Sequence, residues 1–362
     1  SPGGRENARP SMISNRNRLF GRAAGFQASA LALLLALLAG CGSRESVGPS
    51  DSPSVSAPAD SVTPTDSTLV PPTDSTFTIP ADSTAGLVPT TGAAYTPPGV
   101  VFGTFDMKNE LLGSLHTGSR RAPGPDNIVG LLSGARAKRA RLVISLYGGS
   151  DGNVKNADGT FSLTKWQARV GAFKGVNFSS YISDGTVLAH YMIDEPNNPA
   201  KWGGQIVPQA TIEAMAKYSK QIWPGMVTLA RVVPSWLASA PITYTYLDAA
   251  WAQYRSSKGD VARFAASEIA AAKTKGLGVM VGLNILNGGN GSSGIRGTKS
   301  GEYSMSATEL KTYGTAMLSN PYVCGFMMWE YNLTYYGRSD IKSAMAELSP
   351  KASSHPQTSC RQ

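Results

Sequence analysis

From residue 99 onward, short apolar runs alternate with longer stretches of helical periodicity. The runs are rich in β-branched and aromatic residues, and they cover Val100–Phe105, Leu142–Tyr147, Thr186–Ile193, Met226–Val233, Thr243–Leu247, Gly278–Leu283 and Val323–Trp329. Amphipathic helices are predicted between and after them, over Ile212–Ile222, Val261–Lys275, Ala307–Leu318 and Ile341–Leu348. Apolar strands separated by helices indicate a parallel sheet with both faces covered.

This alternation predicts an α/β fold, and its extent favours a (β/α)8 TIM-type barrel over residues 99–350. Such barrels typically take roughly 250 residues. No Gly-x-Gly-x-x-Gly follows the first run, which disfavours a dinucleotide-binding sheet. Seven strand-like runs are visible, so either an eighth strand is hidden or the barrel is incomplete. Residues 351–362 are predicted to form a C-terminal tail.

Residues 1–41 have the features of a signal peptide, with Met12 as the expected start of translation. A basic stretch precedes the apolar run Ala28–Ala39, which is shorter than the ~20 residues that span a bilayer. The end of the run, Leu38-Ala39-Gly40-Cys41, resembles the bacterial lipobox, which implies lipidation of Cys41. The alternative is an ordinary signal peptide with a chance cysteine. Because Gly42 follows rather than Asp, the resemblance favours an exported lipoprotein on the outer membrane or cell surface.

Residues 42–98 are dominated by Ser, Thr, Pro and Asp, with near-repeats such as Pro64-Thr65-Asp66-Ser67-Thr68 and Pro72-Thr73-Asp74-Ser75-Thr76. A segment of this composition buries too little apolar surface to offset the entropy lost on ordering. We therefore expect a disordered tether that gives the following domain reach from the membrane.

The net charge of +9 can favour polyanions, but most of the cations are scattered and no nucleic-acid recognition motif accompanies them. A nucleic-acid partner is therefore not expected. The three cysteines and three histidines form no Cys-x-x-Cys or His-x-x-x-His pair, so no metal site is predicted. No cofactor is expected either.

Polar residues follow several of the apolar runs, where a barrel of this type places its functional groups. Glu195 and Glu330 each come directly after such a run. Two carboxylates across a barrel mouth suit glycoside hydrolysis, in which one donates a proton to the leaving oxygen and the other attacks the anomeric carbon or activates water. These two residues are the predicted catalytic pair.

The segments Tyr191–Pro196 and Met328–Tyr331 resemble the glycoside hydrolase TIM-barrel superfamily, over roughly residues 99–350. In its retaining clan the acid/base glutamate ends the fourth strand and the nucleophile ends the seventh. The resemblance thus implies that Glu195 is the acid/base and Glu330 the nucleophile. The sequence departs from the clan at two points: Asp194 replaces Asn, and Glu195 falls on the third visible strand.

Substrate contacts are expected from aromatic rings, which pack on the apolar faces of sugars, and from polar groups that bind hydroxyls. The predicted set is Asp106, Tyr147, Asp194, Asn197, Trp202, Arg231, Trp236, Asp248, Trp251, Asn284, Trp329 and Tyr331. Each of these residues has a structural role as the alternative. Several rings are expected to belong to the core, Arg231 is a candidate salt-bridge partner for Glu195, and Asp194 is an alternative acid.

Cys324 opens the last predicted strand and Cys360 lies in the C-terminal tail. Export makes a disulfide between them permissible, and two free thiols are the alternative. Taken together, the sequence predicts a glycoside hydrolase that acts on an extracellular polysaccharide or oligosaccharide. The alternative is a non-catalytic glycan-binding lipoprotein on the same barrel, since fold does not fix function. A structural surface protein with a relic barrel is a third hypothesis.

Overall fold

The computed structural model describes residues 98–356 and 359–361. The predicted signal peptide, the lipobox with Cys41 and the tether up to residue 97 lie outside the described residues. No helix in the described part of the chain combines the length and apolar character needed to cross a bilayer.

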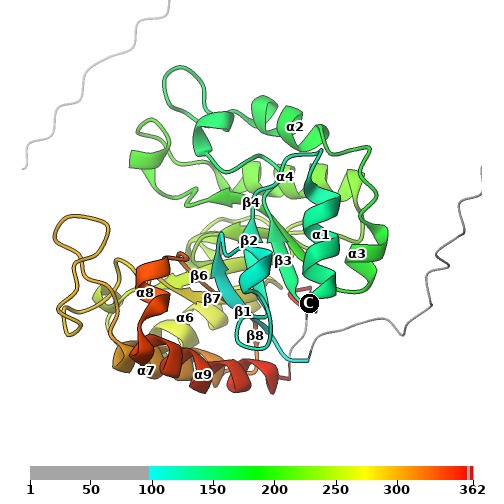
Figure 1. Ribbon diagram of the computed structural model, residues 1–362. Coiled ribbons are helices and arrows are strands. Elements are labelled where there is room, and N and C mark those ends of the chain that lie inside the picture. Colours follow the sequence, from blue (N-terminus) through cyan, green and yellow to red (C-terminus); the bar gives the residue numbers. More distant parts are fainter. Residues whose placement is uncertain (1–97, 357–358, 362) are drawn as a thin grey trace, which may run out of the picture. The chain divides into compact units, whose positions relative to one another are not determined.

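Eight parallel strands form a closed barrel in which each strand pairs with its neighbours in sequence and the last pairs with the first (Figure 1). The strands are β1 (Val101–Phe105), β2 (Gly118–Arg121), β3 (Arg141–Ile144), β4 (Val187–Asp194), β5 (Thr228–Arg231), β6 (Ala249–Tyr254), β7 (Gly278–Leu283) and β8 (Val323–Met328). The predicted (β/α)8 barrel is confirmed, and it is complete rather than lacking a strand.

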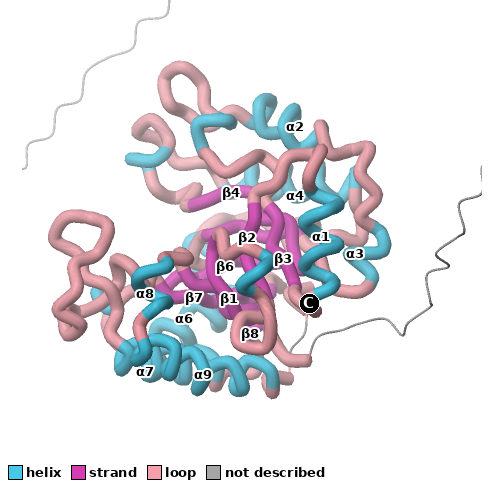
Figure 2. Tube along the Cα trace, in the orientation of Figure 1, coloured by secondary structure: helices cyan, strands magenta, loops and turns pink. Residues whose placement is uncertain are grey.

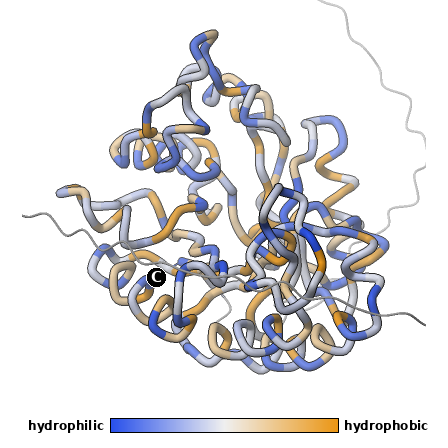
Figure 3. Tube along the Cα trace, turned by 90° about the vertical axis from the view of Figure 1, so that its left-hand side faces the viewer, coloured by the Kyte–Doolittle hydropathy of each residue, from blue (hydrophilic) through white to orange (hydrophobic). Residues whose placement is uncertain are grey.

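Helices surround the strands, as Figure 2 shows. Those within the described residues are α1 (Ile128–Ala137), α2 (Leu163–Gly171), α3 (Ser179–Ser183), α4 (Gln209–Ile222), α5 (Pro234–Ala238), α6 (Val261–Lys273), α7 (Ala307–Leu318), α8 (Leu333–Gly337) and α9 (Ser339–Ser353). Apolar and polar residues alternate along the longer ones (Figure 3), because one face packs on the barrel and the other meets water.

The hidden strand is β2, whose sequence Gly-Ser-Arg-Arg carries no apolar residue. Arg120 points into the barrel and is only 6% exposed. Its guanidinium lies 5.2 Å from the ring centroid of Phe105 and 5.1 Å from that of Tyr191, and it pairs with Asp106 at 3.4 Å. A buried arginine is tolerated when it is paired, so a strand without apolar side chains still belongs to this interior.

The prediction of a strand at Thr243–Leu247 is wrong. The carboxylate of Glu213 on α4 accepts backbone hydrogen bonds from Thr245, Tyr246 and Leu247, at 2.7, 2.9 and 3.0 Å. Backbone groups held by a side chain in this way are not available to a sheet ladder. The strand follows instead as β6, and it includes Trp251, which was expected beyond a strand end.

The barrel interior differs between its two ends. Deep in the barrel, Val101 and Met280 meet around Gly325, where even a methyl group would collide with Met280. Toward the carboxyl ends of the strands, Trp251 stacks on Phe105 with centroids 4.9 Å apart, and Tyr191 packs edge-on against Trp251 at 5.8 Å. This aromatic layer is the floor on which the polar groups of the mouth are built.

At the amino ends of the strands, Cys324 on β8 and Cys360 form a disulfide bond. The bond holds the C-terminal tail beside the start of β7, where the Cys360 carbonyl lies against Gly278 so closely that a side chain there would collide with it. Helix α9 continues three residues into the segment predicted as tail, ending at Ser353.

Candidate active site

The hidden β2 shifts the strand count, so that Glu195 follows β4, the fourth strand, and Glu330 lies two residues after β8, the eighth. The resemblance assigned the nucleophile to the seventh strand. That strand, β7, ends at Leu283 and is followed by Asn284, so Glu330 does not occupy the implied position. Both carboxylates nevertheless belong to the carboxyl ends of the strands, where such barrels carry their sites.

Glu195 has a left-handed backbone conformation, with φ of 46°. Among the described residues only two other non-glycine residues have positive φ, Asp106 at 56° and Arg139 at 53°. Asp106 follows β1, so two of the three strained positions put a carboxylate at the same barrel mouth. Strain of this kind costs of order 1–3 kcal/mol and clusters at functional sites.

Neighbouring groups hold Glu195 in this conformation. Its backbone N–H donates to the Arg231 carbonyl at 2.9 Å, and its carbonyl accepts from the Trp202 indole at 3.0 Å. Its carboxylate contacts Arg231 Nη2 at 3.2 Å and accepts from Asn198 Nδ2 at 3.3 Å. The side chain remains 42% exposed, so it is positioned on one side and open to a ligand on the other.

Asp194 is the centre of an ionic cluster beside Glu195. It pairs with Arg231 and Lys201, and it accepts a hydrogen bond from the Tyr191 hydroxyl at 2.7 Å. Burial by itself would raise the pKa of Asp194, but the charges and hydrogen bonds of Arg231 and Lys201 outweigh it and hold that pKa well below its usual range. At neutral pH Asp194 is therefore expected to be an anion, which argues against the alternative that it acts as the acid.

Glu330 lies in a second group with Asp106 and Arg120. The backbone N–H of Tyr331 donates to the Phe105 carbonyl at 3.0 Å, and that of Asp106 donates to the Arg120 carbonyl at 2.9 Å, which joins the ends of β8, β1 and β2. Burial raises the pKa of Glu330, repulsion from Asp106 raises it further, and Arg120 opposes both. The net effect is a pKa of Glu330 above its usual value.

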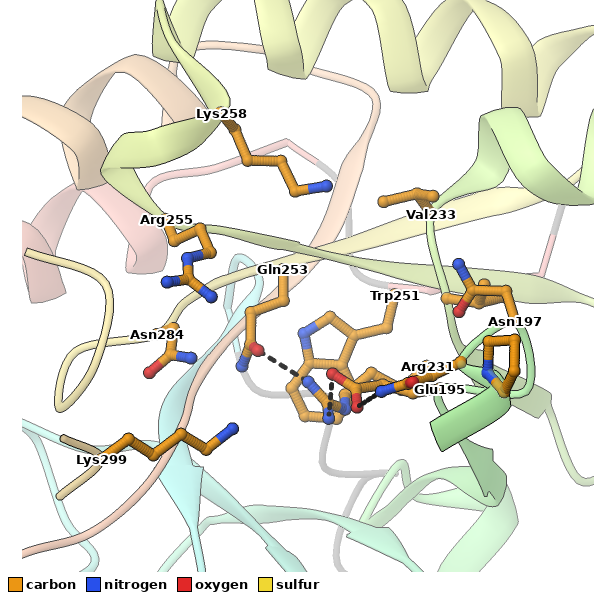
Figure 4. A pocket seen from close by; sticks show the side chains of 13 residues that line it. Glu195, Asn197, Arg231, Val233, Trp251, Gln253, Arg255, Lys258, Asn284 and Lys299 are labelled. Atoms are coloured by element: carbon orange, nitrogen blue, oxygen red, sulfur yellow. Dashed lines mark hydrogen bonds and ion pairs between the residues drawn. The ribbon is translucent and has the colours of Figure 1, made fainter. Parts of the chain in front are cut away.

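A cavity of about 400 Å³ opens above the aromatic floor, between the ends of β4, β5, β6 and β7 (Figure 4). Glu195 lies at one side and Trp251 at its base. Amide side chains suited to sugar hydroxyls line it, namely Asn197, Asn198, Gln253 and Asn284. Gln253 is fixed through its carbonyl oxygen by Arg231 Nη1 at 2.7 Å, while its buried NH₂ group has no partner in the described structure.

Several predicted substrate contacts are core residues instead. Trp202, Tyr147 and Trp251 are 1%, 2% and 0% exposed. Trp202 packs edge-on against Phe161 and supports Glu195, and Tyr147 stacks on Tyr191 at 6.5 Å. Trp251 reaches the cavity only as part of its floor. The expectation that several of the predicted rings belong to the core holds for these three. Trp251 was expected beyond a strand end because the strand before it was placed too early in the chain.

The remaining aromatic predictions are half-buried: Trp236 on α5, and Trp329 and Tyr331 on either side of Glu330. Trp329 extends β8 by a bridge to Asn284, and Tyr331 stacks on Tyr336 with centroids 5.4 Å apart. These three rings keep exposed surface, so they remain candidates for sugar contacts.

Asp248 lies at the opposite end of the barrel from the mouth. It directly precedes β6 and accepts from the backbone N–H of Thr228, the first residue of β5, at 2.8 Å. It also forms an ion pair with Lys220, at 2.5 Å, and one with Arg361, at 3.5 Å. The expectation that it contacts substrate is corrected, because the misplaced strand at Thr243–Leu247 had put it at a carboxyl end.

Five cations near the mouth were not predicted: Arg120, Lys201, Arg255, Lys258 and Lys299. Arg255 directly follows β6, and the three lysines lie farther along loops that follow strands. Had β6 been placed correctly, Arg255 would have been predicted as a site residue, because it directly follows that strand. Across the described residues, no group of three or more His, Cys, Asp or Glu side chains is arranged to hold a metal ion.

No family model matches the chain, and no curated protein matches it. Similar solved structures include a β-glucanase from Saccharophagus degradans, 13% identical with a TM-score of 0.47, over 72% of this chain and 89% of that chain. A GH18 chitinase from Pseudoalteromonas aurantia is 11% identical with a TM-score of 0.43, over 68% and 99%. The major endoglucanase of Xanthomonas campestris pv. campestris is 10% identical with a TM-score of 0.44, over 71% and 94%. The glucanase, chitinase and endoglucanase activities belong to these three similar proteins.

Proposed function

We propose that this protein is a glycoside hydrolase that cleaves a polysaccharide or oligosaccharide outside the cytoplasm, held to a membrane through Cys41. The observation that carries the enzymatic part is the pair of carboxylates at one barrel mouth in different electrostatic surroundings. Glu195 contacts a guanidinium at 3.2 Å, whereas burial and the neighbouring Asp106 raise the pKa of Glu330. Pairs of carboxyl groups whose surroundings differ in this way are suited to divided acid and base roles.

The surroundings favour roles opposite to those that the resemblance implied. Glu330, whose pKa is raised by burial and by Asp106, would give its proton to the glycosidic oxygen as the bond from that oxygen to the anomeric carbon breaks. Glu195, in contact with Arg231, would act as the anion that attacks the anomeric carbon or takes a proton from the attacking water. Asn197, Asn284 and Gln253 would bind hydroxyls of the sugar.

Hydrolysis of a broad glycan panel by the purified protein tests the proposal, beside Glu195→Gln and Glu330→Gln. Removing a catalytic carboxylate should lower kcat/KM by roughly 100-fold or more. The matched control is Glu347→Gln, on the exposed face of α9, where the carboxylate only pairs with Lys311 at 3.3 Å. This control should keep full activity.

Leaving-group chemistry separates the two roles. With an activated aryl glycoside the leaving group needs no proton, so Glu330→Gln should recover much of its rate while Glu195→Gln stays inactive. The reverse pattern would restore the roles implied by the resemblance.

The non-catalytic glycan-binding protein remains the second candidate, because Arg231 pairs with both Asp194 and Glu195. A carboxylate used only to balance a buried arginine would give this geometry without catalysis. Saturable glycan binding that survives both Gln substitutions, with no turnover on any glycan, would establish that candidate.

A further inference from the structure

The cavity at the barrel mouth is lined by one carboxylate, that of Glu195, and by four cations, Arg231, Arg255, Lys258 and Lys299. Two of these cations are compensated. Arg231 pairs with Asp194 and Glu195, and Arg255 pairs with Glu302 at 2.6 Å. In the described part of the chain, Lys258 and Lys299 have no carboxylate partner, so the cavity carries an excess of positive charge.

The uncompensated cations come from two separate segments that face the same space. Lys258 ends a short 3₁₀ helix (Ser256–Lys258) after β6, and Lys299 belongs to the loop between β7 and α7. Figure 4 shows their ammonium groups reaching in from opposite sides of Gln253, with the Arg255 guanidinium beside Asn284. An acidic sugar in this space would lie between cations from both segments.

The loop that carries Lys299 is fixed by its own hydrogen bonds. Asn287, 1% exposed, accepts from the Lys299 backbone N–H at 3.0 Å and donates to Thr298 Oγ1 at 2.7 Å. Glu302 of the same loop pairs with Arg255, which ties the loop to the end of β6. The fold therefore holds the backbone segments of Arg255 and Lys299 at the same cavity, although the like charges on them repel each other.

A neutral sugar can use the amides of this cavity for its hydroxyls, but it gains no charge–charge attraction from the cations. An anionic group gains from it both in affinity and in the rate of capture. We propose that the cavity takes an acidic glycan, with a carboxylate or sulfate ester on the sugar bound between Lys258, Lys299 and Arg255, and hydroxyls facing Gln253 and Asn197. This assignment rests on the proposed function, since it specifies the glycan that the same site would cleave.

Binding is measured by titration calorimetry on the full-length protein, independently of turnover. The probes are a uronic acid oligosaccharide, a sulfated oligosaccharide and a neutral oligosaccharide of the same length. At least one acidic probe should bind about 10-fold or more tightly than the neutral one at low salt, and should lose that advantage between about 50 and about 500 mM NaCl. The preferred acidic probe distinguishes carboxylate from sulfate.

Lys258→Ala and Lys299→Ala should each weaken acidic binding by about 5-fold and leave neutral binding unchanged. Lys→Arg at either position should retain most of the affinity. Both side chains are exposed, so the fold should tolerate these changes, as equal melting temperatures would verify. Lys311→Ala, on α7 and paired with Glu347 rather than lining the cavity, is the matched control and should change neither affinity.

Equal binding of neutral and acidic probes, or lysine variants that behave like the control, would overturn the acidic-glycan assignment. Binding of a single-stranded oligonucleotide with the same lysine dependence, and of no glycan, would overturn it as well. Different results would contradict the proposed function and this inference. Binding of an acidic glycan without turnover would contradict the proposed hydrolase activity. Cleavage of neutral glycans alone would support that activity and contradict the acidic-glycan assignment.

Discussion

Arg120 and Arg231 approach the same aromatic ring. Their guanidinium carbons lie 5.2 and 5.9 Å from the centroid of Phe105, and each side chain is almost fully buried. Each cation is balanced by a carboxylate at a strand end, Asp106 for Arg120 and Asp194 for Arg231. The two groups of charges that flank the candidate catalytic residues are thus connected through one ring of the barrel interior.

Arg231→Met should lower the free energy of unfolding by about 3 kcal/mol or more, because it leaves the largely buried Asp194 carboxylate with Lys201 as its one remaining paired cation among the described residues. Urea unfolding measures the change. Arg338→Met is the control, since Arg338 forms a more exposed pair with Asp340 and should cost less than about 1 kcal/mol. Similar losses for the two variants would contradict the buried role of Arg231.

Asp194 should make the free energy of unfolding depend on pH in the acidic range. Its folded pKa lies below the unfolded value of about 3.9, so its contribution is present above that pH and is lost as the pH falls toward the folded pKa. The wild-type protein should therefore lose stability below about pH 4 more steeply than Asp194→Asn, which is less stable at neutral pH but lacks this titration. Parallel pH–stability curves for the two proteins would refute the role given to Asp194.

Asp106→Asn should shift the pH–rate profile through Glu330. Rates should fall as the pH rises through the pKa of the acid, which burial and Asp106 place above its usual value. Removing the Asp106 charge lowers that pKa and also leaves Arg120 free to lower it further, so the alkaline limb of kcat/KM should move to lower pH. Asn tolerates the left-handed backbone at this position, so the fold should be retained. An unmoved limb would mean that Glu330 is not the acid.

Trp202→Phe should impair turnover more than binding. It removes the indole hydrogen bond to the Glu195 carbonyl, at 3.0 Å, and should cost about 1 kcal/mol of stability. Trp166→Phe is matched to it, because this buried indole donates at 2.8 Å to the carbonyl of Met192 on β4, three residues before Glu195. Both variants should lose similar stability, and only Trp202→Phe should lower kcat. A comparable fall in kcat for both would reduce Trp202 to a packing residue.

Replacing both Cys324 and Cys360 by Ala should lower stability by about 4 kcal/mol, the chain-entropy estimate for a cross-link between residues 36 apart. Thermal melting of the oxidised protein, the reduced protein and the double variant measures it. Reduction should reproduce the effect of the double variant, and the activity of the folded fraction should not change, because the bond lies at the amino ends of the strands. Two free thiols in the native protein, counted by mass spectrometry without reductant, would contradict the bond.

The strands that could be predicted from sequence are those buried on both faces, such as β4 and β7, where apolar character is continuous. The strand β2 could not, because its place in the interior depends on Asp106, a partner brought near by folding. The false strand at Thr243–Leu247 has strand-like composition, but three of its backbone N–H groups donate to Glu213, more than 30 residues earlier in the chain. Local pattern carries no information on either long-range contact.

The candidate site shows the same division. Glu195 and Asn284 were found because they directly follow apolar strands, and Asn197 because it lies three residues after β4. All three line the cavity. Trp202 and Asp248 were predicted to contact substrate for the same reason, their place after a predicted strand. In the structure Trp202 is buried behind Glu195, and Asp248 lies at the opposite end of the barrel. Lys258 and Lys299 sit in loops without periodicity, so their convergence on one cavity follows from tertiary structure alone.

The change in the interior from Val101 and Met280 to the layer of Arg120, Arg231 and Trp251 has a consequence for engineering this barrel. Near the amino ends of the strands, the effect of a substitution on stability should depend on side-chain volume, and adding or removing one methyl group should already matter. Near the mouth they should be judged by charge balance, and arginines and aspartates have to be exchanged together. A new active site grafted onto this scaffold would therefore have to keep the charges of this layer balanced as a set, because each arginine is compensated by a carboxylate from the neighbouring strand.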